Sequence, residues 1–372
     1  MLSRVSAVLT LLMALAPAAL RAQDPPTAVV LTYHIVQSPN DTVFSMTREE
    51  FRRQMEFLRA TGYTVISLAD LNDYVTGKRE SIPDQSVVIT IDDGWKCTYT
   101  EIFPVMKEMG FPFTVFIYPK FIGKSAYALS WKEVSAMVAE GVDIQSHATS
   151  HPFLTKRTAA ALRAELVESR RAIEEHTGKP VRFIAYPYGD YNKRVMRATE
   201  AAGYDAGLTC NFGPVTKGSN PYEMKRVILY QKTTFASFRK LLGSEELKLA
   251  DVSPAPGGEF QLDEPVVAAR IADFEDLEPD SVNLAIVGLK RAPYSYDPRD
   301  GSISLVLRDA EPGRRYSAAV WGVDRKSGKR REAVWTFALP AGSRPLVAAR
   351  REPTRVASDA GAVAAASMSG QR

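Results

Sequence analysis

Two short stretches of the sequence carry the side chains best suited to chemistry. Asp92 and Asp93 are adjacent carboxylates after one apolar run, and His147 and His151 lie four residues apart after another. Two imidazoles at this spacing converge on one cation if the segment coils through about one turn. Together with one carboxylate they form a three-ligand site that leaves a position for water, and the second carboxylate is placed to act as a general base. The sequence therefore predicts a metal-dependent hydrolytic centre.

A third stretch, Tyr186-Pro187-Tyr188-Gly189, follows an apolar run and forms a loop that can present a backbone N–H to a ligand. Each of the three stretches also has an ordinary structural interpretation. Asp-Gly and Pro-Gly are common turn dipeptides, and histidines often make plain polar contacts. It is the combination of the stretches that favours a functional site.

The elements around these stretches alternate between short apolar runs and amphipathic segments. The apolar runs lie at 28–33, 86–91, 114–117, 143–145, 183–185 and 206–209, and the main helical segments at 47–61, 100–109, 131–140, 159–176 and 192–202. Strands that alternate with helices pair in parallel through crossover helices, and about seven or eight such units favour a closed α/β barrel. Functional residues of such barrels gather where the strands end. His34, Asp92 and His147 each lie at the end of a predicted strand.

The pattern changes near Asp251. A linker-like cluster, Pro254-Ala255-Pro256-Gly257-Gly258, precedes short alternating runs separated by Gly and Pro turns, which predict a small all-β sandwich. Residues beyond Pro340 are rich in Ala, Arg and Ser without periodicity and are expected to be disordered. The expected domains are a signal peptide at 1–22, the barrel at 23–250, a linker at 251–263, the sandwich at 264–340 and a tail at 341–372.

The first residues have the features of a secretory signal. Arg4 precedes an apolar run from Val8 to Ala16, and small residues continue to Ala22. The run is shorter than the ~20 residues that span a bilayer, so cleavage is favoured over a retained anchor. We therefore expect an exported protein, periplasmic or extracellular, without an integral membrane span. The net charge of +4 comes without a dense Lys/Arg stripe, which argues against nucleic-acid binding.

The chain has two cysteines, Cys97 just after the Asp-Asp stretch and Cys210 just past a predicted strand. Both should lie near the rim of the barrel that carries the strand ends. We expect a disulfide if the two strands are neighbours. Two unpaired, buried thiols are an equally good alternative.

These stretches resemble the polysaccharide deacetylases that share the NodB homology domain (carbohydrate esterase family 4). The resemblance covers about Ala28–Leu242 and is strong in Thr90–Gly94 and in Ser146–Pro152. It implies a distorted (β/α)7–8 barrel of the NodB type that acts on a polysaccharide. It also implies that Asp92 is the base, that Asp93, His147 and His151 bind a divalent metal, and that the Tyr188 backbone N–H helps to hold the oxyanion. Zn²⁺ is the expected metal, with Co²⁺ or Ni²⁺ as alternatives.

The sequence departs from the family pattern in three places. Tyr186 replaces the Arg that usually pairs with the base, Ala148 replaces a Ser or Thr, and no late histidine acid is recognisable around 226–231. The opening Leu31-Thr32-Tyr33-His34 and the Tyr-Pro-Tyr-Gly loop look like the subgroup that acts on poly-β-1,6-N-acetylglucosamine. His34 is the candidate general acid because its strand should end on the same face; the alternative is a hydrogen-bonded histidine that orients Asp92 or a ligand.

The expected activity is therefore removal of N-acetyl groups from a polysaccharide that contains N-acetylglucosamine. Two other functions stay open at this point. One is an O-acetyl esterase on acetylated, xylan-like glycans, which the same centre would serve. The other is a catalytically silent glycan-binding or adhesion protein in which the β module does the work.

Overall fold

The computed structural model describes residues 26–37, 42–243, 245–256, 260 and 266–340. The chain divides into two compact units, the first ending at Ser244 and the second beginning at Glu245. The expected signal peptide and the expected tail lie outside the described residues. Among the helices of the described ranges, none is both long and apolar enough to cross a membrane.

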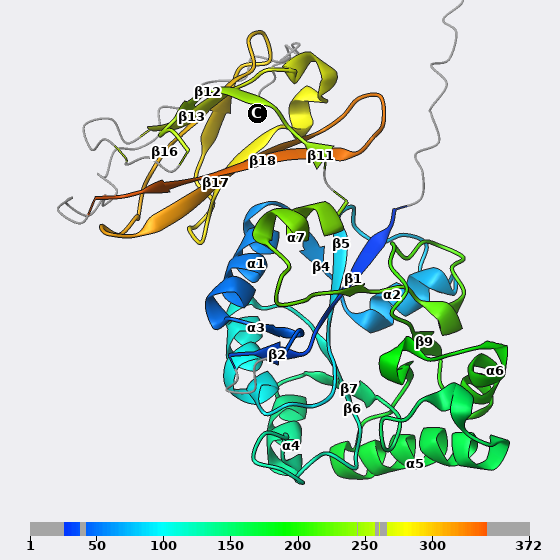
Figure 1. Ribbon diagram of the computed structural model, residues 1–372. Coiled ribbons are helices and arrows are strands. Elements are labelled where there is room, and N and C mark those ends of the chain that lie inside the picture. The colour runs from blue at the N-terminus through cyan, green and yellow to red at the C-terminus, as the bar shows by residue number, and fades with distance from the viewer. Residues whose placement is uncertain (1–25, 38–41, 244, 257–259, 261–265, 341–372) are drawn as a thin grey trace, which may run out of the picture. The chain divides into compact units, whose positions relative to one another are not determined.

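The core of the first unit is a curved parallel sheet (Figure 1). Its strands follow in the order β10 (Val227–Ile228), β1 (Ala28–Tyr33), β5 (Ser86–Ile91), β6 (Thr114–Ile117), β7 (Asp143–Ser146), β8 (Phe183–Ala185) and β9 (Ala206–Leu208). The segment before β10 returns to β9 through one parallel bridge, between Leu208 and Met224. The predicted distorted α/β barrel is therefore confirmed, as an incompletely closed one.

Strand β5 is an interior strand of this sheet and also the source of its distortion. Along one edge it pairs with β1 over its whole length. Its other edge is shared, because β4 (Thr64–Val65) pairs with Ser86 and Val87 whereas β6 pairs with Thr90 and Ile91. All six residues of β5 are buried, as expected for a parallel strand that is covered on both faces. The strand thus delivers Asp92 and Asp93 from a rigid base.

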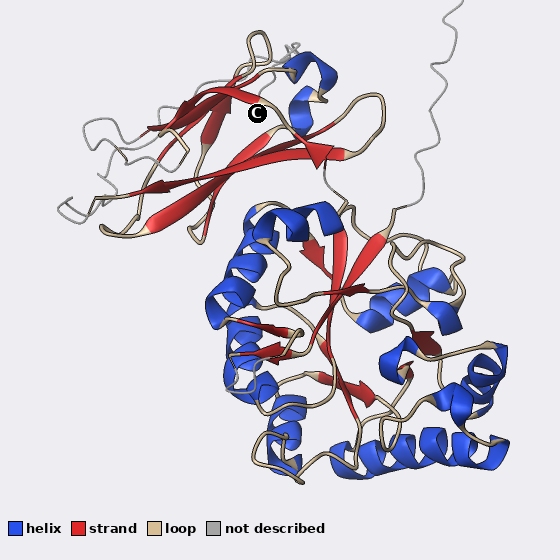
Figure 2. Ribbon diagram, viewed as in Figure 1, coloured by secondary structure: helices blue, strands red, loops and turns tan. Residues whose placement is uncertain are grey.

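Helices cover the outside of the strands (Figures 1 and 2). They are α1 (Arg48–Ala60), α2 (Leu68–Val75), α3 (Phe103–Met109), α4 (Trp131–Ala139), α5 (Ala159–Thr177), α6 (Lys193–Ala201) and α7 (Phe235–Leu241). Helix α1 begins where its capping signal predicts, since the Thr47 side chain accepts a hydrogen bond from the Glu50 N–H. Helix α3 begins later than predicted, because Thr98–Ile102 forms a π-helical turn.

The second unit contains two four-stranded sheets and confirms the predicted all-β module. One sheet has the order β11 (Glu245–Glu246), β18 (Arg330–Ala338), β17 (Arg315–Val323) and β14 (Asn283–Val287), and the other β12 (Leu249–Ser253), β13 (Val266–Ile271), β16 (Ser302–Val306) and β15 (Tyr294–Tyr296). Alternating apolar residues such as Val267, Leu284, Val320 and Phe337 form its buried core.

The boundary between the units differs from the expected one. The linker expected at 251–263 begins inside β12, which pairs antiparallel with β13, and the second unit starts before it with β11. Both residues of β11 are exposed glutamates, so no hydrophobic pattern reveals the strand. β12 is followed directly by Pro254, and the sequence after it is rich in Pro and Gly, as linkers are.

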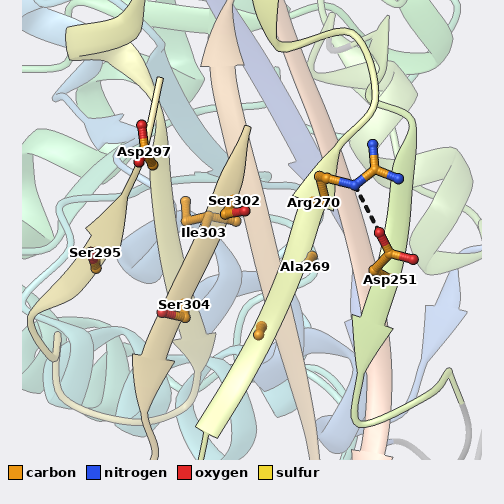
Figure 3. A pocket seen from close by; sticks show the side chains of 9 residues that line it. Asp251, Ala269, Arg270, Ser295, Asp297, Ser302, Ile303 and Ser304 are labelled. Carbon is orange, nitrogen blue, oxygen red and sulfur yellow. Dashed lines mark hydrogen bonds and ion pairs between the residues drawn. The ribbon is translucent and has the colours of Figure 1, made fainter. Parts of the chain in front are cut away.

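A shallow pocket lies on the outer face of the β12–β13–β16–β15 sheet (Figure 3). Ser302 and Ser304 of β16 line it, and the Arg270 Nε donates a 2.7 Å hydrogen bond to Asp251 at its edge. The side chains that line it include neither a histidine nor a cysteine. The residues suited to hydrolytic chemistry are instead in the first unit.

Candidate metal centre

Three predicted ligands converge at the carboxyl ends of β5 and β7. The His147 Nε2 and the His151 Nε2 lie 3.1 Å apart, and they lie 3.6 and 3.5 Å, respectively, from the Asp93 Oδ1. Two ligands about 2.1 Å from a tetrahedral ion are separated by about 3.4 Å. Two imidazole nitrogens and one carboxylate oxygen at these separations fit a divalent cation that accepts nitrogen and oxygen ligands.

Hydrogen bonds around the ligands fix the atoms that face the centre. The His147 Nδ1 lies 2.7 Å from the Ala185 carbonyl oxygen at the end of β8, which sets Nδ1 as the donor and leaves Nε2 with its lone pair toward the centre. The Trp95 Nε1–H donates to the Asp93 Oδ2, so that Oδ1 faces the imidazoles. Burial, together with the neighbouring His147, lowers the pKa of His151 to about 4, which keeps this ligand neutral at pH 7.

The backbone at the ligands is strained. Asp93, Ala148 and His151 have φ values of 76°, 60° and 56°, in a region that costs a non-glycine residue about 1–3 kcal/mol. Gly94 has φ 82°, and a Cβ there would lie 2.9 Å from the Ile122 side chain. Several strained residues so close together persist only if contacts with the surrounding structure hold them in these conformations.

Glu165 of α5 supplies that support for the loop that joins the two histidines. Its Oε2 accepts hydrogen bonds of 2.9 Å from the backbone N–H groups of Thr149 and Ser150, and its Oε1 accepts one of 2.6 Å from the Ser150 hydroxyl. The Thr149 hydroxyl donates to the Glu165 carbonyl oxygen. One helical residue therefore holds the middle of the His147–His151 segment.

Asp92 is buried beside the three ligands and pairs with Arg226, which lies just before β10. The Arg226 Nη1 donates a 2.8 Å hydrogen bond to the Asp92 Oδ1, and the Arg226 Nε donates to the Thr209 carbonyl oxygen. Both side chains are almost fully buried, at 1% and 3% exposure. Arg226 is thus the residue that pairs with Asp92. Tyr186, in the position where the family usually has Arg, does not pair with it, because the Tyr186 hydroxyl donates to the Tyr222 carbonyl oxygen.

The pairing sets the charge of Asp92. Burial by itself raises the pKa of this carboxyl group, but the positive charge of Arg226, with smaller contributions from His147 and His34, outweighs burial and lowers the pKa to about 2. Asp92 is therefore an anion at neutral pH, as a proton acceptor must be.

His34 lies next to Asp92 because of the strand register. Tyr33 pairs with Ile91, so the residues that follow them emerge side by side, and the His34 Nε2 lies 4.0 Å from the Asp92 Oδ2. Its ring stacks on Phe44, with 4.6 Å between the centroids. The Nδ1 of His34 is buried without a hydrogen-bond partner among the described residues. The structure thus brings His34 to the site and leaves it without the hydrogen bonds expected of a structural histidine.

Tyr188 reaches the site from the loop after β8. Its ring contacts the His151 ring, with 4.4 Å between centroids, and its φ is 59°. It is the middle residue of η3 (Pro187–Gly189), but its own φ and ψ are not helical, and the hydrogen bonds of this turn are donated by the N–H groups of Gly189 and Asp190.

The disulfide considered for Cys97 and Cys210 is absent, and both thiols are free. The condition for the bridge is not met, because Cys97 follows β5 and Cys210 follows β9, and these strands are not neighbours. Cys97 is buried, which raises the pKa of its thiol to about 11, whereas Cys210 is exposed.

Comparison with known proteins agrees with this geometry. A family model described as polysaccharide deacetylase matches residues 79–207, a range that holds Asp92, the three ligands and Tyr188. The poly-β-1,6-N-acetyl-D-glucosamine N-deacetylase of Staphylococcus epidermidis is 26% identical over 230 residues, which cover 54% of this chain and 78% of the relative. The YxkH protein of Bacillus subtilis is 27% identical over 208 residues, with 56% and 73% covered.

Solved structures show the same fold. The structure of IcaB from Ammonifex degensii matches with a TM-score of 0.54 at 25% identity, covering 59% of this chain and 97% of that one. The deacetylase PplD of Streptococcus pyogenes matches in fold with a TM-score of 0.55 at 20% identity, covering 59% and 99%. Residues 79–207 of the chain therefore belong to the polysaccharide deacetylase family of enzymes.

The first prediction concerns Glu165. Replacing it with Ala removes three acceptor contacts from the ligand loop, and loss of such supporting contacts typically weakens metal affinity about 10–100-fold. We expect this loss for Glu165→Ala in a competition titration of Zn²⁺ against a chromophoric chelator. Glu168→Ala, at an exposed position of the same helix, is the matched control and should bind as the unaltered protein does. Equal affinity for both variants would contradict the role of Glu165.

The second prediction concerns the buried ion pair. The folded-state pKa of Asp92, about 2, is below its ordinary value near 4, so the pair stabilises the fold fully above about pH 4 and loses this effect as the pH falls toward 2. In chelator-treated protein at pH 7, Arg226→Met leaves an unpaired buried carboxylate, which should lower the free energy of unfolding by about 3–5 kcal/mol.

Urea unfolding followed by fluorescence measures this loss, with Arg182→Met as the control for a half-exposed pair with Asp205 that contributes less than about 1 kcal/mol. Adding Asp92→Asn to Arg226→Met should recover part of the loss, and the deficit of Arg226→Met should shrink toward pH 4. A double variant as unstable as Arg226→Met alone would show that the charge of Asp92 is not the cause.

Proposed function

We propose that this protein removes N-acetyl groups from a polysaccharide that contains N-acetylglucosamine, with poly-β-1,6-N-acetylglucosamine as the substrate class. The observation that carries the proposal is the ionised, Arg226-paired Asp92 beside the Asp93–His147–His151 ligand set. The named activity of the staphylococcal relatives, at 24–26% identity, supports the choice of glycan. We also propose that the protein acts after export, as its first residues suggest.

Asp93, His147 and His151 would hold the divalent cation, with Zn²⁺ the best match to two imidazoles and one carboxylate. When bound, such a cation lowers the pKa of water and polarises a carbonyl group. Asp92 accepts the proton of the attacking water, and Arg226 keeps the carboxylate charged and oriented for that step. The Tyr188 N–H is the protein's own donor to the oxyanion that forms on the acetamide oxygen.

The amine leaves only after its nitrogen gains a proton. Burial lowers the pKa of His34, and Asp92 and Asp93 offset this only in part, so the ring is neutral before reaction. The His34 Nε2, 4.0 Å from the Asp92 Oδ2, is placed to take over the proton that Asp92 has accepted and to pass it to the departing amine. In this scheme His34 is a proton carrier and does not need to be charged at rest.

The third prediction tests the reaction and the substrate together. The unaltered protein loaded with Zn²⁺ should release acetate and free amine from β-1,6-linked N-acetylglucosamine oligomers, and chelation should abolish the release. Asp92→Asn should lower kcat by about 10²–10⁴ while Zn²⁺ stays bound, and Asp84→Asn, at an exposed position, should leave kcat unchanged.

Release from β-1,4-linked oligomers only would mean that the substrate is a different glycan. Release from acetylated xylan only would mean that the enzyme is an esterase and not an amidase. Binding of the oligomers without release would identify a silent glycan-binding protein.

The fourth prediction separates proton transfer from structural support by His34. His34→Gln keeps a polar side chain of moderate size but cannot carry a proton, so kcat should fall by about 10²–10⁴ with little change in KM or in melting temperature. The loss should be smaller with an ester substrate, because an alkoxide leaves with less need of a proton than an amine does. A matching loss on both substrates, together with a lower melting temperature, would mean that His34 only supports the site.

A further inference from the structure

Two tyrosines bracket the turn that carries the Tyr188 N–H. Tyr186 precedes the turn and Tyr191 follows it, and their rings stack with 5.5 Å between centroids and 9° between planes. The Gly189 N–H donates a 2.8 Å hydrogen bond back to the Tyr186 carbonyl oxygen. Tyr186 is fully buried and Tyr191 is half-buried. The stacked rings therefore fix both ends of the turn.

Both tyrosine hydroxyls bind the same one-turn helix, η4 (Pro221–Glu223). The Tyr186 hydroxyl donates to the Tyr222 carbonyl oxygen at 3.0 Å, and the Tyr191 hydroxyl donates to the Glu223 Oε1 at 2.5 Å. The second bond joins a phenol to a carboxylate, and its length is typical of a charge-assisted hydrogen bond. Burial and this bond raise the pKa of Tyr191, so the phenol keeps its proton and stays a donor.

The Tyr191 hydroxyl also binds the segment that holds Arg226. It accepts a 2.7 Å hydrogen bond from the Asn211 Nδ2. The Asn211 carbonyl oxygen accepts the Arg226 backbone N–H at 2.9 Å, and the Thr209 carbonyl oxygen accepts the Arg226 Nε at 2.9 Å. Glu223, the other partner of the hydroxyl, lies three residues before Arg226 in the chain. One hydroxyl group therefore joins the two pieces of chain that position Arg226.

A direct contact joins the turn to the same segment. A Cβ at Gly189 would lie 2.7 Å from the Cys210 Cβ and 2.9 Å from the Cys210 sulfur, so the turn packs on Cys210 without room for a side chain. The residues on either side of Cys210 are the two whose carbonyl oxygens bind Arg226. A shift of the turn therefore displaces the groups that hold Arg226, and the reverse also holds.

The two groups joined in this way serve separate steps of the proposed reaction. We propose that the Tyr191 hydroxyl is a positioning group that holds Arg226 and the Tyr188 N–H in one fixed arrangement. The base and the oxyanion donor are then aligned with each other independently of the metal. Within the described residues, the hydrogen bonds and the ring contact of Tyr191 go to Glu223, Asn211 and Tyr186, and none goes to a metal ligand.

The inference rests on the proposed function for the reaction, so its test includes a readout that needs neither metal nor substrate. Tyr191→Phe keeps the ring that stacks on Tyr186 and removes only the hydroxyl. Tyr74→Phe is the matched control, because the Tyr74 hydroxyl donates a hydrogen bond of similar length, 2.7 Å, to the Pro26 carbonyl oxygen. Both variants lose one phenol group, but only Tyr191 is joined to the site.

The readout without metal is the rate at which a chromogenic disulfide reagent labels Cys210. Cys210 is exposed whereas Cys97 is buried, so Cys210 is the thiol that reacts first. Its sulfur packs toward Gly189, and partial burial raises the pKa of the thiol, so loosening of this contact speeds the labelling. In chelator-treated protein, Tyr191→Phe should label about fivefold faster, as expected for the loss of one net hydrogen bond from the closed arrangement. Tyr74→Phe should label at the unaltered rate.

The second readout is the reaction of Zn²⁺-loaded protein with β-1,6-linked N-acetylglucosamine oligomers. Tyr191→Phe should lower kcat by about 10–10², the cost of a small misplacement of reacting groups, with KM and Zn²⁺ affinity nearly unchanged. Glu223→Gln keeps an acceptor for the phenol and should retain most of kcat, whereas Glu223→Ala should lose as much as Tyr191→Phe. Adding Glu223→Ala to Tyr191→Phe should cost little more, because both changes break the same link.

An unaltered labelling rate in Tyr191→Phe would overturn the inference, and so would an unaltered kcat or an equal fall of kcat in Tyr74→Phe. A loss of Zn²⁺ affinity in parallel with kcat would also overturn it, because the hydroxyl would then support the metal ligands. Faster labelling of Tyr191→Phe, in a protein that releases no acetate from any oligomer, would reject the proposed reaction and retain the link between the turn and Arg226. Acetate release that does not depend on the Tyr191 hydroxyl would do the opposite.

Discussion

The buried ion pair between Arg226 and Asp92 is the interaction on which the rest of the site depends. It joins the segment before β10 to the end of β5, and these two strands lie on either side of β1. The pair therefore closes over the end of β1, where His34 emerges in register with Asp92. A buried pair is often no more stabilising than apolar residues of similar volume, because desolvation offsets the attraction, but it fixes the position and charge of both partners. Here it keeps a carboxylate ionised in a place where burial by itself raises the pKa of that group.

The pair also shows that the partner of Asp92 comes from a part of the chain other than the expected one. The usual position of the orienting Arg holds Tyr186, whose side chain is directed to Tyr222 and packs over Gly207, where a Cβ would lie 2.0 Å from the tyrosine hydroxyl. Arg226 instead reaches Asp92 from the segment before β10 and donates a hydrogen bond to its carboxylate. Roles in a site are defined by distances and charges rather than by the order of motifs.

Much of the fold and the candidate metal ligands follow from local sequence patterns. The apolar runs and capping signals predict the alternating strands and helices, and parallel topology then places Asp92, Asp93 and His147 at one edge of the sheet. Arg226 and Glu165 have no such local signal. Arg226 is 134 residues from its partner, and Glu165 looks like any charged residue of an amphipathic helix. The choice between a disulfide and free thiols stayed open for a related reason, since strand order decides whether Cys97 and Cys210 meet, and composition does not give strand order.

The site also depends on contacts that a motif does not contain. Asp93, Ala148, His151 and Tyr188 all have positive φ, each at about 1–3 kcal/mol, whereas the net stability of a domain is only about 5–15 kcal/mol. Strain of this size persists only where contacts with neighbouring groups make the strained conformation lower in free energy than the relaxed ones. Glu165 does so for the histidine loop, and Asp190 does so for the Tyr188 loop by accepting bonds from Thr155. The ligands are recognisable in the sequence because chemistry restricts their type, but the residues that hold them in strained positions are recognisable only once the chain has folded.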